Sequence, residues 1–61
     1  MKPFPHVVAE FVAFRRGLLE ERFGVTRADV LLWSLGLRTP NFILERRVTE
    51  FIEAYWSELL R

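Results

Sequence analysis

Residues 23–30 read Phe-Gly-Val-Thr-Arg-Ala-Asp-Val and hold a helix-stop signal followed at once by a helix-start signal. Gly24 follows an apolar periodic segment, and Val25 supplies the apolar residue of a Schellman stop, in which the glycine takes a left-handed conformation. Thr26 is a good N-cap, and Asp29 at the third helical position completes a capping box. One helix is therefore expected to end here and a second to begin.

The same pair of signals recurs further along the chain. Residues 35–37, Leu-Gly-Leu, repeat the glycine stop, and Thr39 followed by Pro40 offers an N-cap with proline at the first helical position. Because both connections are short, the helices should pack into one compact single domain over residues 1–61. We predict an all-α fold, a compact three-helix unit with helices at about residues 5–23, 27–35 and 40–60.

Helical periodicity indicates how the predicted helices would pack. The first carries two adjacent apolar stripes, so it should touch two neighbours. Arg15 and Arg22 fall between the stripes, and each should extend to solvent or pair with a carboxylate, because an unpaired buried charge is costly. The second helix is apolar on nearly every side, through Val30, Leu31, Leu32, Trp33 and Leu35. The third has one apolar face, formed by Leu44, Val48, Phe51, Ile52, Tyr55 and Leu59.

This apolar content is more than so short a chain can enclose. The chain has 61 residues, 51% of them hydrophobic, and no cysteine, which excludes a disulfide framework or a cysteine-based zinc site. Area scaling implies that folding buries roughly 6,400 Å², and the apolar share of about 58% is worth on the order of 90 kcal/mol, while ordering the chain costs on the order of 90 kcal/mol. We therefore expect self-association as a homodimeric helical bundle with two-fold symmetry.

The predicted interface between copies should be anchored by aromatic side chains, since Trp and Tyr are enriched in contact hot spots. Trp33 and Trp56 are the two residues that could equally belong to the intrachain core. The candidate interface residues are Trp33, Phe51, Tyr55, Trp56 and Leu59.

Catalytic signatures are missing from the sequence. His6, the only histidine, has i, i+4 spacing to Glu10, but with no third ligand in view we interpret the pair as surface residues near a helix N-terminus. No nucleophile elbow, glycine-rich phosphate loop or paired-carboxylate motif occurs. We predict that the protein is not an enzyme and has no catalytic residues, no cofactor and no metal site, unless copies share a site at their interface.

Two function classes remain. The first is an oligomerisation or protein–protein interaction module whose partner is a second copy or another protein. The alternative is a small DNA-binding or antitoxin-like regulator, because residues 26–47 have the outline of a degenerate helix-turn-helix. Against it, Glu45 and Glu50 lie on the proposed reading helix, and the net charge is only +1. Its nucleic-acid contacts would be Arg15, Arg16, Asn41, Arg46 and Arg47.

The location of the protein can be inferred only by exclusion. The first residues lack the apolar core of a signal peptide, and the longest uncharged apolar segment, residues 30–37, is far too short to span a membrane. Acidic residues on the polar face of the first helix argue against binding to a membrane surface. We expect a cytoplasmic protein, and the eight arginines against one lysine are compatible with a thermophilic source.

Overall fold

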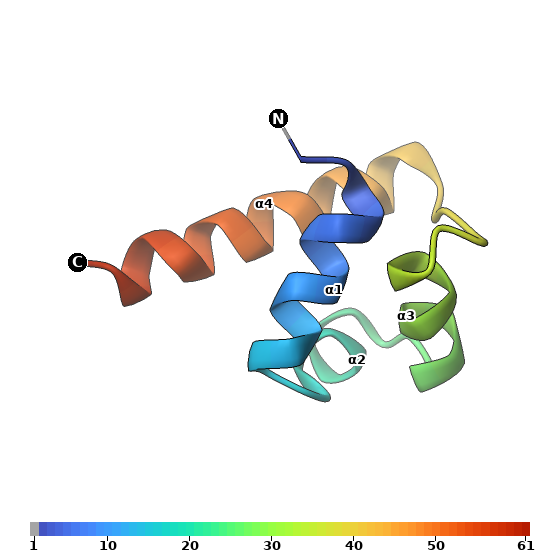
Figure 1. Cartoon of the computed structure of the whole chain (residues 1–61), viewed down its shortest axis with the longest axis horizontal. Coiled ribbons are helices and arrows are strands. Elements are labelled where there is room, and N and C mark those ends of the chain that lie inside the picture. The colour runs from blue at the N-terminus through green and yellow to red at the C-terminus, as the bar shows by residue number, and fades with distance from the viewer. Residues whose placement is uncertain (1) are drawn as a thin grey trace.

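The computed structural model describes residues 2–61, which contain helices and no strand. The predicted all-α class is confirmed. In chain order the helices are α1 (Phe4–Phe14), α2 (Leu18–Phe23), α3 (Arg27–Ser34) and α4 (Phe42–Leu59). Helix α1 is central, because it packs against α3 on one side and α4 on another, while α2 packs against α3 (Figure 1).

All four helices contribute to one hydrophobic core. Its buried members are Val8, Phe11, Leu19, Val30, Trp33, Val48 and Ile52. Phe11 is fully covered and lies at the crossing of α1 and α4. The rings of Phe51, Tyr55 and Trp56 surround it edge-on, with centroids 6.1, 5.1 and 6.0 Å away. Edge-to-face packing of this kind adds about 0.5–1.5 kcal/mol per pair beyond simple burial.

The continuous helix predicted for residues 5–23 is wrong, since the chain breaks it in the middle. Helix α1 ends at Phe14, and Arg15 adopts an extended backbone with φ −133° and ψ 94°. Gly17 then takes a left-handed φ of +82°. The apolar periodicity continues across this point, so it carries no sign of the break. Glycine adopts this φ at little cost, and tertiary packing decides that it does so here.

The break lets α2 turn back onto the rest of the molecule. Leu19 becomes fully buried. Phe23 reaches α4, where its ring lies edge-on to that of Phe51 at a centroid distance of 5.5 Å. A straight continuation of α1 would run on by 1.5 Å per residue instead of folding back. The turn at residues 15–17 therefore places α2 against both α3 and α4.

Replacing Gly17 with alanine tests this turn. No atom lies within 4 Å of the added Cβ, so the cost is the left-handed backbone alone. We expect Gly17→Ala to lower the free energy of unfolding by about 1 kcal/mol, and Gly17→Asn to lower it by less, because asparagine visits this region more readily. Urea denaturation of the three proteins measures the difference. Equal stability of the alanine variant would mean that α1 and α2 can join as one straight helix.

The stop and start signals at residues 24–29 are borne out with one difference. The Thr26 hydroxyl accepts from the Asp29 N–H at 3.1 Å, and the Asp29 carboxylate accepts from the Thr26 N–H at 3.3 Å, so the predicted capping box is confirmed. Gly24 has the expected positive φ, but its N–H makes a single bond to the Glu20 carbonyl at 2.9 Å. That is the simpler αL stop rather than the full Schellman motif.

The second glycine stop has the complete Schellman pattern. Gly36 has φ +73°, and its N–H bonds the Trp33 carbonyl at 3.1 Å. The Leu37 N–H bonds the Leu32 carbonyl at 3.0 Å. This is the paired arrangement that satisfies the last carbonyls of a helix. Helix α3 accordingly ends at Ser34, close to the predicted end.

The predicted start of the last helix is wrong by two residues. Asn41, not Thr39, is the N-cap, and its side-chain oxygen accepts from the Leu44 N–H at 2.9 Å. Asparagine caps a helix at least as well as threonine. Pro40 therefore precedes the helix in the extended connection instead of beginning it. This gives α4 a start at Phe42.

Candidate interaction surfaces

The end of α4 extends past the helix that covers its beginning. Along one apolar face, Val48 and Ile52 are buried, Tyr55 is half-buried, and Leu59 is 51% exposed. Helix α1, which packs on this face, ends at Phe14. Figure 1 shows the last turns of α4 projecting beyond the other helices. The apolar face of α4 therefore extends beyond the end of α1, the helix that buries its beginning.

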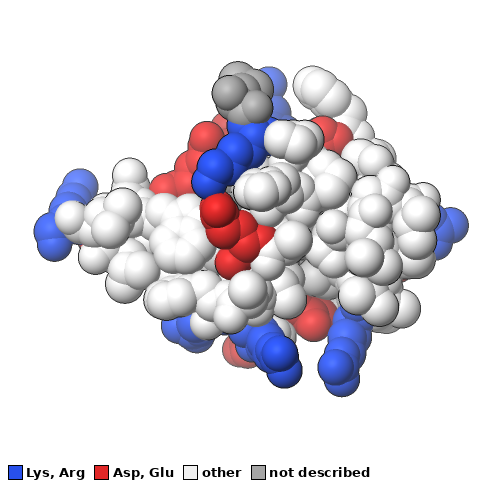
Figure 2. Space-filling view, in the orientation of Figure 1, with Lys and Arg blue, Asp and Glu red and all other residues white. Residues whose placement is uncertain are grey.

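Neighbouring side chains enlarge this uncovered face into a surface that we call the C-terminal apolar patch. The Phe14 ring lies 5.1 Å from that of Trp56 and 6.3 Å from that of Tyr55. Leu60, one turn beyond Trp56, is 82% exposed. The patch comprises Phe14, Tyr55, Trp56, Leu59 and Leu60. Figure 2 shows the corresponding end of the molecule as mostly uncharged surface.

The predicted interface residues separate into three groups. Trp33 is only 3% exposed and lies in the chain's own core, with its ring 6.0 Å from that of Phe4, so it offers no surface to a partner. Phe51 is half-buried between α1 and α2. Tyr55, Trp56 and Leu59 all lie on the C-terminal apolar patch.

Two residues of the patch were missed by sequence reasoning. Phe14 belongs to a stripe that was expected to face a neighbouring helix, and it is exposed because α1 stops there. Leu60 lies in the last predicted turn, and nothing in the periodicity indicates that its partner helix ends early. The signal that could have found both is Gly17, the one residue in the predicted first helix with a clear preference for ending it.

The accessible area of the whole chain agrees with an uncovered surface. The chain exposes 4705 Å². A monomeric protein of this mass typically exposes about 4,200 Å², so the excess is about 500 Å². Part of it lies over α3 and the connection to α4, where Figure 2 shows a broad uncharged area. The exposed apolar residues there are Leu31, Leu35, Leu37, Phe42 and Ile43.

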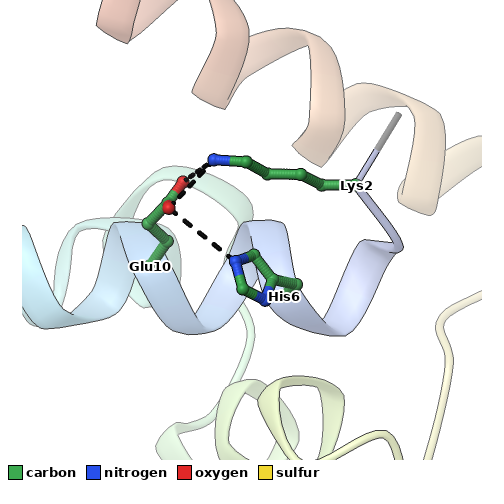
Figure 3. A network of polar contacts seen from close by, with 3 residues as sticks. All are labelled: Lys2, His6 and Glu10. Atoms are coloured by element: carbon green, nitrogen blue, oxygen red, sulfur yellow. Dashed lines mark hydrogen bonds and ion pairs between the residues drawn. The ribbon is translucent and has the colours of Figure 1, made fainter.

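A polar network lies on the exposed side of α1 (Figure 3). The Lys2 ammonium donates to both oxygens of Glu10, at 2.9 and 3.0 Å, and His6 Nε2 lies 3.8 Å from the same carboxylate. The hydrogen bond from Lys2 is the main cause that lowers the pKa of Glu10. Within residues 2–61 no group of three or more His, Cys, Asp or Glu side chains is placed to hold a metal ion. The network is an exposed ion pair with a histidine beside it.

Replacing Lys2 with glutamine should raise the pKa of Glu10 towards its ordinary value. The folded-state pKa is lowered, so the ionised carboxylate contributes stability above the pKa of the unfolded chain and loses it as pH falls through the folded pKa. NMR titration of the Glu10 carboxyl carbon from about pH 2 to 7 measures the shift. Arg61→Gln is the control, because Arg61 pairs with Glu58 at 3.8 Å near the end of α4 and does not line the hollow that holds Glu10. An unchanged Glu10 titration in Lys2→Gln would contradict the assignment.

The five residues predicted to contact nucleic acid do not all gather on one surface. Asn41 caps α4, and Arg46 is paired with Glu50. Arg16, Arg46 and Arg47 line three different hollows, of about 560, 770 and 590 Å³. Arg15 lies instead against α4, where its guanidinium donates to the Tyr55 hydroxyl at 2.6 Å. The five residues therefore do not form the single DNA-contacting face that a helix-turn-helix requires.

The remaining findings concern the membrane and known proteins. Among residues 2–61, every helix is too short or too polar to cross a bilayer. The main uncovered surfaces of the chain are the C-terminal apolar patch and the uncharged area over α3.

Comparison with protein-family models, with curated proteins and with solved structures found no match to this sequence or fold.

Proposed function

We propose that this protein is a non-enzymatic interaction module that forms a homodimer through its C-terminal apolar patch. The observation that carries the proposal is the apolar face of α4, which is buried at Val48 and Ile52 and uncovered at Leu59. A second copy is the simplest cover, because it brings an identical apolar surface. Two-fold contacts of this self-matching type are the commonest in soluble oligomers.

The proposed arrangement places the ends of two α4 helices side by side and antiparallel. In that geometry Leu59 and Leu60 of each copy meet the patch of its partner, and Phe14 lies at the border of the contact. Glu58 and Arg61, which pair at 3.8 Å within the chain, flank the patch and can exchange partners across the two-fold axis. Exposed ion pairs of this kind fix the alignment of the two helices more than they add to the affinity of the dimer.

The expected strength follows from the area available. Part of the excess exposed area lies over α3, so the patches of two copies offer less than about 1,000 Å² together, which is the size of weak, transient protein interfaces. Translational and rotational entropy opposes the contact, so area alone does not give high affinity. We expect a dimer that forms at micromolar concentration.

Sedimentation equilibrium from about 1 to 100 µM tests the proposal. The weight-average mass should rise from 7.3 kDa towards twice that value. The melting temperature should rise over the same range, because association stabilises only the folded chain. A folded monomer at every concentration, with a constant melting temperature, removes the proposal.

The alternative of a duplex DNA-binding regulator has less support. The main packing of α3 is against α1 and α2, and that of α4 is against α1, so the two do not form a compact helix-turn-helix unit of their own. Titration with duplex DNA at about 50 mM salt decides the matter, because phosphate contacts are strongest at low salt. A flat titration eliminates this alternative.

A further inference from the structure

Three arginines lie along one side of α4 and form a surface that we call the arginine strip, made of Arg15, Arg22 and Arg47. The Arg15 guanidinium is 5.7 Å from the centre of the Tyr55 ring, and that of Arg22 is 5.6 Å from the centre of the Phe51 ring. Arg47 and Arg22 line one hollow of about 590 Å³, which Phe51 also lines. On α4, residues 47, 51 and 55 follow one another at one-turn spacing, so the strip is about 12 Å long.

The strip exists because of the break between α1 and α2. Sequence reasoning expected Arg15 and Arg22 to reach solvent or to pair with carboxylates. They are exposed, but each lies over an aromatic ring of α4. The Tyr55 hydroxyl also holds Arg15 by a hydrogen bond of 2.6 Å. Both guanidinium groups are therefore positioned before any ligand arrives, which reduces the entropy lost on binding.

The positive charge of the strip is not neutralised within the chain. Among the described residues, no ion pair involves Arg15, Arg22 or Arg47. Glu50 borders the hollow, but it is paired with Arg46 at 3.6 Å. Glu58, further along α4, is paired with Arg61 at 3.8 Å. Arginine stays charged at every physiological pH, so three cations remain available.

The net charge of +1 conceals a separation of charge across α4. The hollow between α4 and the beginning of α1 is lined by more acidic than basic side chains. These are Glu10, Glu45, Glu50 and Glu53, against Lys2 and Arg46. An anionic ligand is thus attracted to the strip and repelled from the acidic side of the same helix.

We propose that the arginine strip binds single-stranded nucleic acid through its phosphate backbone. The guanidinium fork matches phosphate oxygens in a bidentate geometry. The half-buried rings of Phe51 and Tyr55 lie beneath the guanidinium groups of Arg22 and Arg15, and guanidinium planes held in this way can stack on unpaired bases of a single strand. An acidic polypeptide would use the charges but not the stacking planes. One chain carries the whole strip, so this binding does not require a second copy, but Tyr55 also belongs to the C-terminal apolar patch, so a dimer formed there would compete with the oligonucleotide for this end of the strip.

Fluorescence anisotropy with a labelled thymidine oligonucleotide of about 20 nucleotides tests the proposal, with protein up to about 1 mM. We expect a dissociation constant on the order of 100 µM at about 50 mM salt. Three phosphate contacts to a single strand predict a slope of about −2 for log affinity against log salt concentration. No binding at about 50 mM salt overturns the proposal.

Matched variants locate the site. Arg22→Gln should weaken binding about 5- to 10-fold at low salt and reduce the salt slope by about 0.7. Arg38→Gln removes the same charge from the exposed connection between α3 and α4, and it should leave binding unchanged. Circular dichroism checks that both variants keep the fold. Equal losses of affinity in the two variants would mean that net charge alone drives binding, and would overturn the assignment of the binding site to the arginine strip.

Two competitors test the kind of ligand. Polyphosphate and polyglutamate of matched charge lack bases, so each should displace the oligonucleotide less effectively than unlabelled oligonucleotide does. Equal competition by polyphosphate would mean that bases add nothing to binding, and would overturn the assignment to nucleic acid. Equal competition by polyglutamate would make an acidic protein segment the ligand, and would overturn the assignment to nucleic acid.

Discussion

Replacement of Phe11 with alanine should lower the melting temperature by more than about 10 °C. Phe11 is fully buried, and the rings of Phe51, Tyr55 and Trp56 pack around it. A buried Phe→Ala change costs about 3–5 kcal/mol. A chain of this length has a total stability of roughly 3–9 kcal/mol. At the middle of these ranges the loss is about 4 of about 6 kcal/mol, so the variant stays folded at room temperature with about one third of the original stability.

Thermal melting followed by far-ultraviolet circular dichroism measures this effect. Phe42→Ala is the matched control, because Phe42 is 76% exposed and its removal should change stability by no more than about 0.5 kcal/mol. If Phe11→Ala melted within a few degrees of the original protein, the crossing of α1 and α4 would not be the centre of the core.

The second large effect is expected in the double variant Leu59→Ser, Leu60→Ser. In the proposed dimer each copy loses the burial of two exposed leucine side chains, worth about 2 kcal/mol per copy and about 4 kcal/mol per dimer. Each 1.4 kcal/mol corresponds to about tenfold in affinity, so the dissociation constant should rise about 1,000-fold. The variant should sediment as a monomer, and its melting temperature should no longer depend on concentration.

Leu35→Ser, Leu37→Ser is the matched control for the dimer. It removes two exposed leucines from the uncharged area over α3 and the following connection, away from the C-terminal apolar patch. Self-association should persist in this variant. The opposite pattern, with a dimer that survives the changes at Leu59 and Leu60 but not those at Leu35 and Leu37, would place the interface on α3.

The fold was predictable where a local signal acts alone. The capping box at Thr26 and the Schellman stop at Gly36 depend on residues within one turn of each other, and both were predicted correctly. The start of α4 was not, because Thr39 and Asn41 are competing caps and the surrounding structure selects between them. The break at Gly17 was missed because the apolar periodicity is uninterrupted there.

The candidate surfaces were predictable to the same extent. Tyr55, Trp56 and Leu59 follow from the periodicity of α4, and all three lie on the C-terminal apolar patch. Which part of that face stays uncovered depends on where α1 stops, and this is a tertiary property. The contact between Arg22 and the Phe51 ring depends on the same break, so a prediction of one continuous first helix could not have included this contact.

Because α1 packs against α4, the hydrophobic core cannot form until the last part of the chain has been synthesised. Phe11 is synthesised before the aromatic side chains that cover it, which belong to residues 51–56. At about 5–20 residues per second, the ribosome needs roughly 2–9 seconds to add that part of the chain. Throughout this interval the apolar faces of the first helix are without their final cover. The nascent chain is then most exposed to aggregation, and this is the period in which a chaperone would have most to protect.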